Sequence, residues 1–460
     1  MVKNKFSSNI IRMALFLGIT FICMLAFVLI QPFGDGPDEI NRYKIVQFIY
    51  THGFLPIGSD PEVLIDGYGA SYAFQPMLTY IIEGYLLHFL SFLLLPFKVQ
   101  LIIARMVNVC FGLIMALYVR KLSVLLFKSE KASWAFTLAV VFLPQNLFIH
   151  TYVNTDSMGL LSIAMIIYAM VKGMKDNYAL KTSIQLSIGI ILCALSYYNC
   201  YGIILCAIFM FILQFFVKKE NSNHYTYDYT SLFKKGGLIT LIVLLGIGWW
   251  FIRNAILYDG DFLALEARRI CAAATGLENF NPLTADTYQS LGIPVLTMIF
   301  GTDYYTLVWK SFIAMFGPML IPTHHYIYMA FKYWFIACLV GLILPVKSHI
   351  MEEYSKKERI SFSLTMTAAM IIPAFLAIYY SYTWDFQPQG RYYLPLVIPF
   401  MFFLTIGILK LFHLLETMAG KINEKAEKMV SFLLFHFLYA FLTLSLLYSV
   451  FVAMLRYYKQ

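Results

Sequence analysis

Apolar residues in this 460-residue chain gather in long runs that short polar stretches separate. A run of about 20 apolar residues is the length that an α-helix needs to cross the hydrocarbon core of a bilayer. We predict eleven membrane-spanning helices, at residues 10–30, 100–119, 132–149, 156–171, 183–198, 201–217, 236–252, 326–345, 361–380, 392–411 and 429–453. The pattern therefore predicts an all-α polytopic membrane protein.

A twelfth apolar stretch, residues 76–95, contains Glu83 and His88, which are unusual in a helix that faces lipid. If this stretch lies in the membrane interface, or dips in and returns, all the lysine-rich loops between the other spans face the cytoplasm together with the N-terminus. If it crosses the bilayer, those loops all face outward. The positive-inside rule favours the first arrangement, with interfacial helices in the first outer segment, although the sequence leaves both open.

This topology places three segments outside the cell membrane: residues 31–98, 253–325 and 382–391. We treat residues 1–411 as one transmembrane module that carries these segments. Residues 412–460 form a basic cytoplasmic loop and a final helix without a functional signal. Basic residues precede the first apolar run and no small-residue cleavage site follows it, so we expect a signal anchor rather than a cleaved signal peptide.

Composition supports a membrane protein and argues against a soluble, a nucleic-acid-binding or a disulfide-rich protein. Hydrophobic residues make up 60% of the chain and charged residues only 13%, about half of what a soluble domain carries. The net charge of +9 is explained by basic loops and anionic lipid headgroups rather than by nucleic acid. The seven cysteines form neither a disulfide framework nor a CxxC pair. We expect no cofactor and no metal.

The most informative polar stretch, residues 31–43, follows the first span directly. It holds Asp35, Asp38 and Glu39 among Gly and Pro residues that favour turns. Carboxylates this close to a membrane must be solvated, paired or used. A positioned carboxylate can take the proton of an attacking hydroxyl group, so these acids are candidates for a general base. The alternative is that they cap an interfacial helix.

Further charged residues lie at the predicted outer ends of other spans. Asp156 opens the fourth span, Arg253 ends the seventh, Arg391 opens the tenth, and Arg105 lies about one turn inside the second. Arginine binds phosphate groups with two parallel hydrogen bonds, so this set suits a substrate with a phosphate. Alternatively, Asp156 caps its helix, Arg253 and Arg391 extend to lipid headgroups, and Arg105 pairs with a buried acid.

Four short motifs at these positions carry a family resemblance: Pro37-Asp38-Glu39, Val153-Asn154-x-Asp156, Trp250-x-x-Arg253-Asn254 and Gly390-Arg391-Tyr392-x-x-Pro395. The chain resembles the GT-C superfamily of integral-membrane glycosyltransferases over most of its length up to about residue 411. Protein O-mannosyltransferases and lipid A aminoarabinose transferases belong to that superfamily. The resemblance implies a GT-C-like bundle and a first-loop acid as catalytic base, Asp38 or Glu39, with Asp38 preferred. Relatives often have a Lys or Arg near Tyr198, where this chain has Asn199.

These observations favour an inverting glycosyltransferase that moves a sugar from a polyprenyl-phosphate carrier to a cell-envelope glycan or lipid-linked acceptor at the outer face of a bacterial cell membrane. The alternatives are a transporter or flippase of lipid-linked saccharide, which needs the arginines but no base, and a non-catalytic assembly subunit. The predicted catalytic residues are Asp38, Glu39 and Asp156, and the predicted donor-phosphate ligands are Arg253, Arg391 and Arg105.

Overall fold

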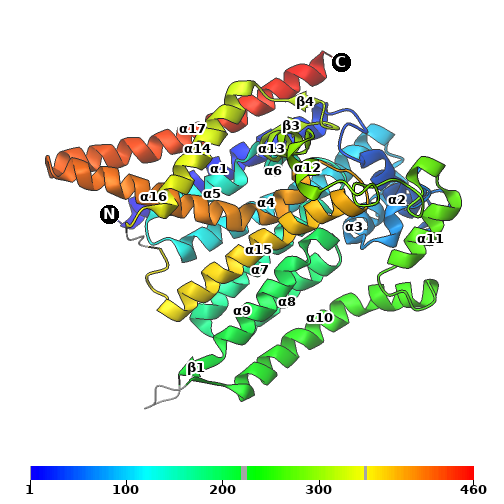
Figure 1. Ribbon diagram of the computed structural model, residues 1–460, viewed down its shortest axis with the longest axis horizontal. Helices are drawn as coiled ribbons and strands as arrows, with labels where there is room; N and C mark the ends of the chain where they lie inside the picture. The colour runs from blue at the N-terminus through cyan, green and yellow to red at the C-terminus, as the bar shows by residue number, and fades with distance from the viewer. Residues whose placement is uncertain (1, 219–224, 347–349, 460) are drawn as a thin grey trace.

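The computed structural model describes residues 2–218, 225–346 and 350–459, which form a bundle of long helices (Figure 1). Every predicted span coincides with helix in this bundle, which confirms the all-α polytopic fold. The helices are α1 (Val2–Ile30), α4 (Phe97–Leu126), α5 (Glu130–Val141), α6 (Pro144–Phe148), α7 (Asp156–Asp176), α8 (Leu180–Ala194), α9 (Gly202–Gln214), α10 (Tyr229–Leu257), α14 (His325–Ile343), α15 (Lys356–Thr383), α16 (Val397–Gly420) and α17 (Glu424–Tyr458).

Eight of the described helices are long and apolar enough to cross a membrane. Shorter helices occupy three of the predicted spans: α5 and α6 lie in the third, α8 in the fifth and α9 in the sixth. The third is divided at Pro144, which lacks the N–H that would continue α5 and which opens α6 instead. The final helix α17 packs against α1, α5 and α16, so it belongs to the same bundle.

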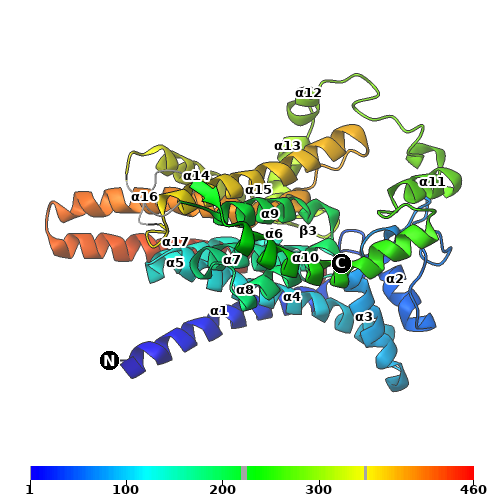
Figure 2. The same cartoon turned by 90° about the horizontal axis from the view of Figure 1, so that it is seen from below.

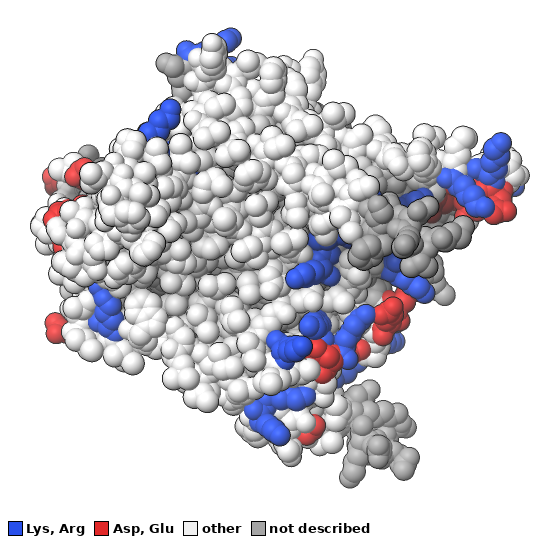
Figure 3. All heavy atoms as spheres, turned by 180° about the vertical axis from the view of Figure 1, so that it is seen from behind, with Lys and Arg blue, Asp and Glu red and all other residues white. Residues whose placement is uncertain are grey.

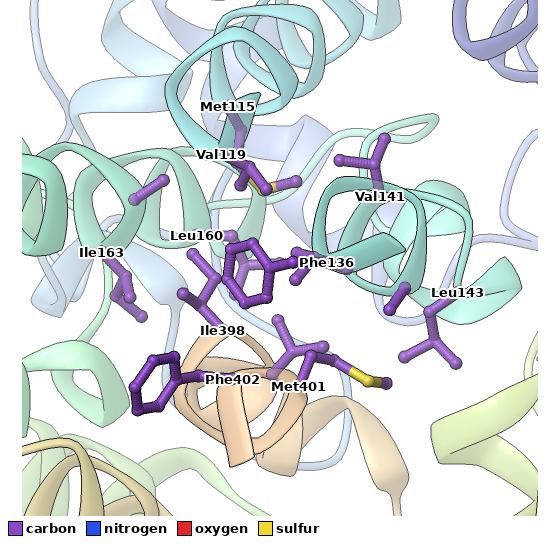
Figure 4. Packing of buried hydrophobic residues seen from close by; sticks show 14 of the residues in the cluster. Met115, Val119, Phe136, Val141, Leu143, Leu160, Ile163, Ile398, Met401 and Phe402 are labelled. Carbon is purple, nitrogen blue, oxygen red and sulfur yellow. The ribbon is translucent and has the colours of Figure 1, made fainter. Parts of the chain in front are cut away.

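The centre of the bundle is α7, which packs against α4, α8 and α9 and is almost completely buried. Side chains from α4, α5, α7 and α16 interdigitate beside it, among them Met115, Phe136, Leu160 and Met401 (Figure 4). In contrast, α10 lies at the margin and most of its apolar surface is exposed, as expected for a helix that faces lipid.

The loops rich in lysine meet at one end of the bundle. Lys175 forms a 2.6 Å ion pair with Glu353, and Lys357 donates to the carbonyl of Leu213 at 2.6 Å. Figure 3 shows Lys and Arg concentrated near one end of a face whose middle is a broad uncharged band. The common location agrees with the predicted arrangement, while the side of the membrane remains a prediction. Residues 219–224 and 347–349 of two of these loops lie outside the described residues.

The first outer segment lies at the opposite end and forms α2 (Glu39–His52), η1 (Tyr72–Phe74), α3 (Leu78–Phe89) and η2 (Ser91–Leu93). With 12 residues, α3 is only about 18 Å long and does not span a bilayer. It packs against α2 beyond the ends of the long helices, with Gly84 in close contact with Ile49 (Figure 1). A helix of this length suits an interfacial position, while the place of residues 76–95 relative to the membrane stays a prediction.

The second outer segment joins the first. It contains α11 (Leu265–Thr275), η4 (Glu278–Phe280), α12 (Val295–Phe300), α13 (Tyr304–Ile313), and strands β3 (Met315–Phe316) and β4 (Ile321–Pro322). The N–H of Leu277 donates to the carbonyl of Gly67 at 2.8 Å, and the rings of Tyr68 and Phe280 stack with centroids 4.4 Å apart. A Cβ on Gly69 would lie 2.1 Å from the nitrogen of Gly276, so this junction requires glycine.

Two small additions to the predicted architecture are β-hairpins. β3 pairs with β4, and β1 (Phe216–Lys218) pairs with β2 (Tyr225–Tyr227), both antiparallel. The third outer segment ends in η5 (Gly390–Leu396), which docks on α13 so closely that a Cβ on Gly390 would lie 2.1 Å from the nitrogen of Phe312. This glycine therefore fixes the backbone that carries Arg391.

Candidate functional site: a cluster of acids and arginines at the outer end

A tight turn after α1 separates the side chains of Asp38 and Glu39. Gly34 has φ +91°, and a Cβ on Gly36 would lie 2.7 Å from the ring of Tyr152. Asp38 itself adopts the left-handed conformation with φ 63°, which aspartate tolerates better than most residues but at some cost in free energy. The turn therefore positions two adjacent carboxylates against different partners.

Glu39 is completely buried and paired with Arg105 of α4. Its two carboxylate oxygens accept hydrogen bonds from Nε at 2.8 Å and Nη2 at 2.6 Å, a bidentate ion pair. The backbone N–H groups of Gly34 and Val153 donate to the same carboxylate, each at 3.2 Å. Glu39 therefore fastens the turn to α4 and to the loop before α7.

The guanidinium of Arg105 has no donor left for a substrate. Beyond Glu39, it donates to the carbonyl oxygens of Val28 at 3.2 Å, Gln31 at 2.8 Å and Pro32 at 3.1 Å. These bonds and the bidentate pair use all five N–H groups of the side chain. Arg105 therefore pairs with a buried acid, which is the alternative that the sequence analysis gave beside its role as a donor-phosphate ligand.

Asp38 is the accessible acid of the cluster. One carboxylate oxygen lies 2.6 Å from Nη2 of Arg391 and 3.8 Å from Nη2 of Arg42, and the hydroxyl of Tyr72 also donates to the carboxylate. Burial raises the pKa of Asp38, but the two arginines and the hydrogen bonds outweigh this effect and lower its pKa to about 2. About a third of the side chain is exposed, 34% against 0% for Glu39.

Asp156 also belongs to the cluster, through a residue that the sequence analysis did not single out. Arg42 of α2 donates to Asp156 at 2.9 Å, and both side chains are almost completely buried. Arg42 also lies over the ring of Tyr72, 5.2 Å from its centroid. The spacing of Asp38 and Arg42, one helical turn apart, was the signal available in the sequence.

Arg253 has its described contacts elsewhere. Its Nη2 donates to the carbonyl of Pro56 at 2.7 Å, and its guanidinium lies over the ring of Trp250. No described contact joins it to Asp38 or Arg391. The structure thus brings together five of the six predicted site residues and places Arg253 where it anchors the first outer segment to α10.

Asp35 is a further carboxylate near the cluster. It is partly exposed and no carboxylate–cation contact is described for it. Burial and the charge of Glu39 raise its pKa above the ordinary value, while Arg105 opposes them. Among the described residues, no group of three His, Cys, Asp or Glu is arranged to hold a metal ion.

Comparison with known proteins identifies a family for this chain and solved structures with a similar fold. A family profile described as "Predicted membrane protein (DUF2142)" matches residues 78–401. Among curated proteins, none matches significantly. The fold is similar to an archaeal oligosaccharyltransferase, AglB from Archaeoglobus fulgidus, solved in complex with an inhibitory peptide and a dolichol-phosphate. The TM-score is 0.50, the identity 15%, and the match covers 96% of this chain and 55% of that chain.

The apo form of the A. fulgidus enzyme gives the same result, with a TM-score of 0.50, 14% identity, and coverage of 95% of this chain and 56% of that chain. This chain thus spans about half the length of these structures. Identity at this level shows the fold alone. Since AglB is a GT-C enzyme, the expected GT-C-like fold is confirmed.

Proposed function

The chain belongs to the DUF2142 family of predicted membrane proteins, and we propose that it is a glycosyltransferase that uses a sugar linked to a polyprenyl phosphate. Two observations support this proposal: the GT-C-like fold, and a partly exposed carboxylate held by two arginines at the end of the bundle opposite the basic loops. AglB, with a similar fold, was solved with a dolichol-phosphate. The acceptor is a cell-envelope glycan or a lipid-linked saccharide at the outer face.

The reaction we propose is a single displacement. The acceptor hydroxyl attacks the anomeric carbon and gives its proton to Asp38. The bond between the anomeric carbon and the phosphate oxygen breaks, and the polyprenyl phosphate leaves with the electron pair. A single displacement inverts the anomeric centre. No diphosphate leaves, so the reaction does not require a metal ion for charge neutralisation.

Accessibility is the observation that selects Asp38 as the base. Glu39 is fully buried and holds the turn, and Asp156 is 7% exposed and holds Arg42. We therefore assign positioning roles to Glu39, Asp156, Arg105 and Arg42. A pKa of about 2 makes Asp38 a weak base as long as Arg391 is bound to it. A donor phosphate that competes for Arg391 would raise the pKa of Asp38 and so activate it.

A transporter of lipid-linked saccharide is the second candidate. The low pKa of Asp38 favours it, because a binding site needs a fixed charge but no base. Movement of the lipid across vesicles without a change in the sugar linkage would support a transporter and contradict the transferase.

The experiment uses the purified full-length protein in vesicles with a panel of undecaprenyl-phosphate sugars and a mixture of lipid-linked acceptors. We expect wild-type protein to release undecaprenyl phosphate and form a glycosylated product. The variant Asp38→Asn should be slower by about 10²- to 10⁴-fold, the usual contribution of a general base. Asp35→Asn is the matched control in the same turn and should stay within a few-fold of wild type. The opposite outcome for these two variants would move the base to Asp35.

A further inference from the structure

The outer half of α10 carries exposed apolar side chains. Leu245, Ile252 and Ile256 are 74%, 57% and 76% exposed, and their helical spacing places them on one side of α10. Within the described part of the chain, α10 packs chiefly against α8. Figure 1 shows α10 at the edge of the bundle, and Figure 2 shows its outer end beside α11 and near α2. This side of α10 is therefore an apolar surface that suits the chains of lipid molecules.

Arg253 lies at the outer end of this surface, and the first outer segment fixes its position. Its Nη2 donates to the carbonyl of Pro56 at 2.7 Å. The hydroxyl of Tyr258, just after α10, accepts a hydrogen bond from the N–H of Gly58 at 2.8 Å, so the same loop is held at two points. An arginine that only extends toward lipid headgroups keeps its guanidinium in water. That of Arg253 is instead positioned by the protein.

The guanidinium of Arg253 still has an unused donor. No ion pair joins it to a carboxylate of the described residues, and its Nη1 is buried without a hydrogen-bond partner among them. The same holds for Nε1 of Trp250, whose ring lies 5.4 Å, from centroid to Cζ, under the guanidinium. Two neighbouring N–H groups without acceptors cost free energy unless an acceptor reaches them. A pair of donors of which one is cationic favours an anion.

We propose that Arg253 binds the phosphate group of a membrane lipid whose chains lie along the exposed side of α10. The charge and the unused donors select a phosphate, and the apolar side chains next to them select a lipid over a free ion. Arg253 is partly exposed, so a change of rotamer, which is common on binding, brings Nη1 to the surface. Trp249 and Tyr258, on either side of Arg253 in the sequence, are of the residue types that gather at the depth of lipid headgroups.

This lipid site lies apart from the pair formed by Asp38 and Arg391, because no described contact joins Arg253 to either residue. The proposal therefore goes beyond the proposed function. It applies equally to a glycosyltransferase and to a transporter, since it concerns a lipid held between α10 and the first outer segment and not the reacting sugar.

The test measures binding of dioleoyl phosphatidic acid to the full-length protein in detergent micelles by native mass spectrometry. We expect Arg253→Gln to weaken binding about tenfold or more, which is the scale of a charge-assisted hydrogen bond. Arg253→Lys keeps the charge and should lose less than Arg253→Gln. Dioleoylglycerol has the same chains without the phosphate, and its weaker binding should be the same in wild type and in both variants.

Two control variants separate loss of the charged donor from other effects. Tyr258→Phe removes the acceptor for the N–H of Gly58 but keeps the cation, and it should bind phosphatidic acid within about threefold of wild type. Arg269→Gln removes a cation of the second outer segment that is already paired with Glu266, and it should stay within about twofold.

Three results would overturn the proposal. The first is an equal loss in Arg253→Gln and Tyr258→Phe, which would mean that only the loop at residues 56–58 matters. The second is the absence of a loss in Arg253→Gln, or an equal loss for dioleoylglycerol. The third is competition by inorganic phosphate as strong as that by phosphatidic acid, which would indicate a site for a free ion. Since no sugar is transferred in this measurement, its result does not depend on the role of Asp38.

Discussion

Two adjacent carboxylates in the first outer segment have opposite surroundings. Glu39 is buried and forms a bidentate pair with an arginine whose five donors are all used inside the protein. Asp38 is a third exposed and shares its charge between two arginines from α2 and η5. The backbone turn at Asp38, with φ 63°, produces this difference because it directs neighbouring side chains to different sides.

The comparison shows how to tell charged residues that hold a membrane protein together from charged residues that can take part in a reaction. A buried ion pair with saturated hydrogen bonds can only hold elements together, since any substrate would have to break it. A pair at the rim, in which one carboxylate is partly open and one arginine comes from a distant segment, can exchange partners. On this basis the Asp38–Arg391 pair is the one to which we assign chemistry in the proposed function.

The largest expected effect comes from breaking the buried pair. Glu39→Gln and Arg105→Leu each leave an unpaired charge or unsatisfied donors in the interior, which costs about 3–5 kcal/mol of folding stability. Asp38→Asn removes a partly exposed pair and should cost about 1 kcal/mol or less. Thermal unfolding of the three purified variants in detergent measures this contrast. Equal destabilisation by Glu39→Gln and Asp38→Asn would mean that the two pairs do not differ as described.

Much of the fold was accessible from sequence because apolar run length sets the position of membrane helices. The ends of short helices were not, since the break at Pro144 and the compact turn between α8 and α9 depend on packing against α7. The prediction that residues 76–95 lie in the interface rested on Glu83 and on the distribution of lysine; the structure shows a short helix there, and its place relative to the membrane stays a prediction. The hairpins β1–β2 and β3–β4 were missed because two- and three-residue strands have no periodic signal.

The sequence predicted only part of the site, because the pairing of its residues depends on how the chain packs. Turn residues and charges near membrane ends pointed to Asp38, Asp156 and Arg391, but the sequence cannot say which cation pairs with which acid. Arg253 was grouped with Arg391 because both lie at the predicted outer end of a span, yet its described bond is to the carbonyl of Pro56. Arg42 was overlooked because an arginine one turn after an acid is common on exposed helices.

The second largest expected effect concerns Arg42, which lies close to the partly exposed Asp38 and also pairs with the buried Asp156. Arg42→Gln leaves Asp156 buried without a cation and should cost about 1.5–3 kcal/mol of stability, the scale of a hydrogen bond to a charged group. It should also raise the pKa of Asp38, which then keeps only Arg391. Unfolding measurements on Arg42→Gln, Asp156→Asn and the double variant form a cycle. If the two single losses simply add in the double variant, the pair is not coupled.

A smaller effect is the acid dependence of stability due to Asp38. Its pKa in the folded protein, about 2, lies below the ordinary value of 3.8, so the unfolded chain binds more protons between these values. The stabilisation is therefore complete above pH 4 and is lost as the pH falls toward 2. Wild type should exceed Asp38→Asn in stability by about 1 kcal/mol or less at pH 6, and the difference should vanish near pH 2. A difference that disappears near pH 5 would show that the arginines do not hold this carboxylate.

The smallest expected effect on stability comes from a second buried glutamate, whose surroundings differ from those of Glu39. Glu83 of α3 is also fully buried, but its described partner is the amide of Asn108 at 2.6 Å rather than an arginine. Burial raises its pKa well above the ordinary value, with Glu39 adding to the effect and Asn108 opposing it. A raised pKa means that folding takes up a proton at neutral pH, so stability falls as the pH rises above about 4.5.

Glu83→Gln removes this cost while it keeps an oxygen for Asn108, so it should be neutral or slightly stabilising, by less than about 1 kcal/mol, the net value of one hydrogen bond. Glu39→Gln should instead destabilise strongly. Unfolding midpoints of wild type and Glu83→Gln at pH 6 and pH 8 provide the measurement, and the advantage of the variant should be greater at pH 8. A clear loss of stability in Glu83→Gln would indicate that Glu83 is ionised and held by a cation, as Glu39 is.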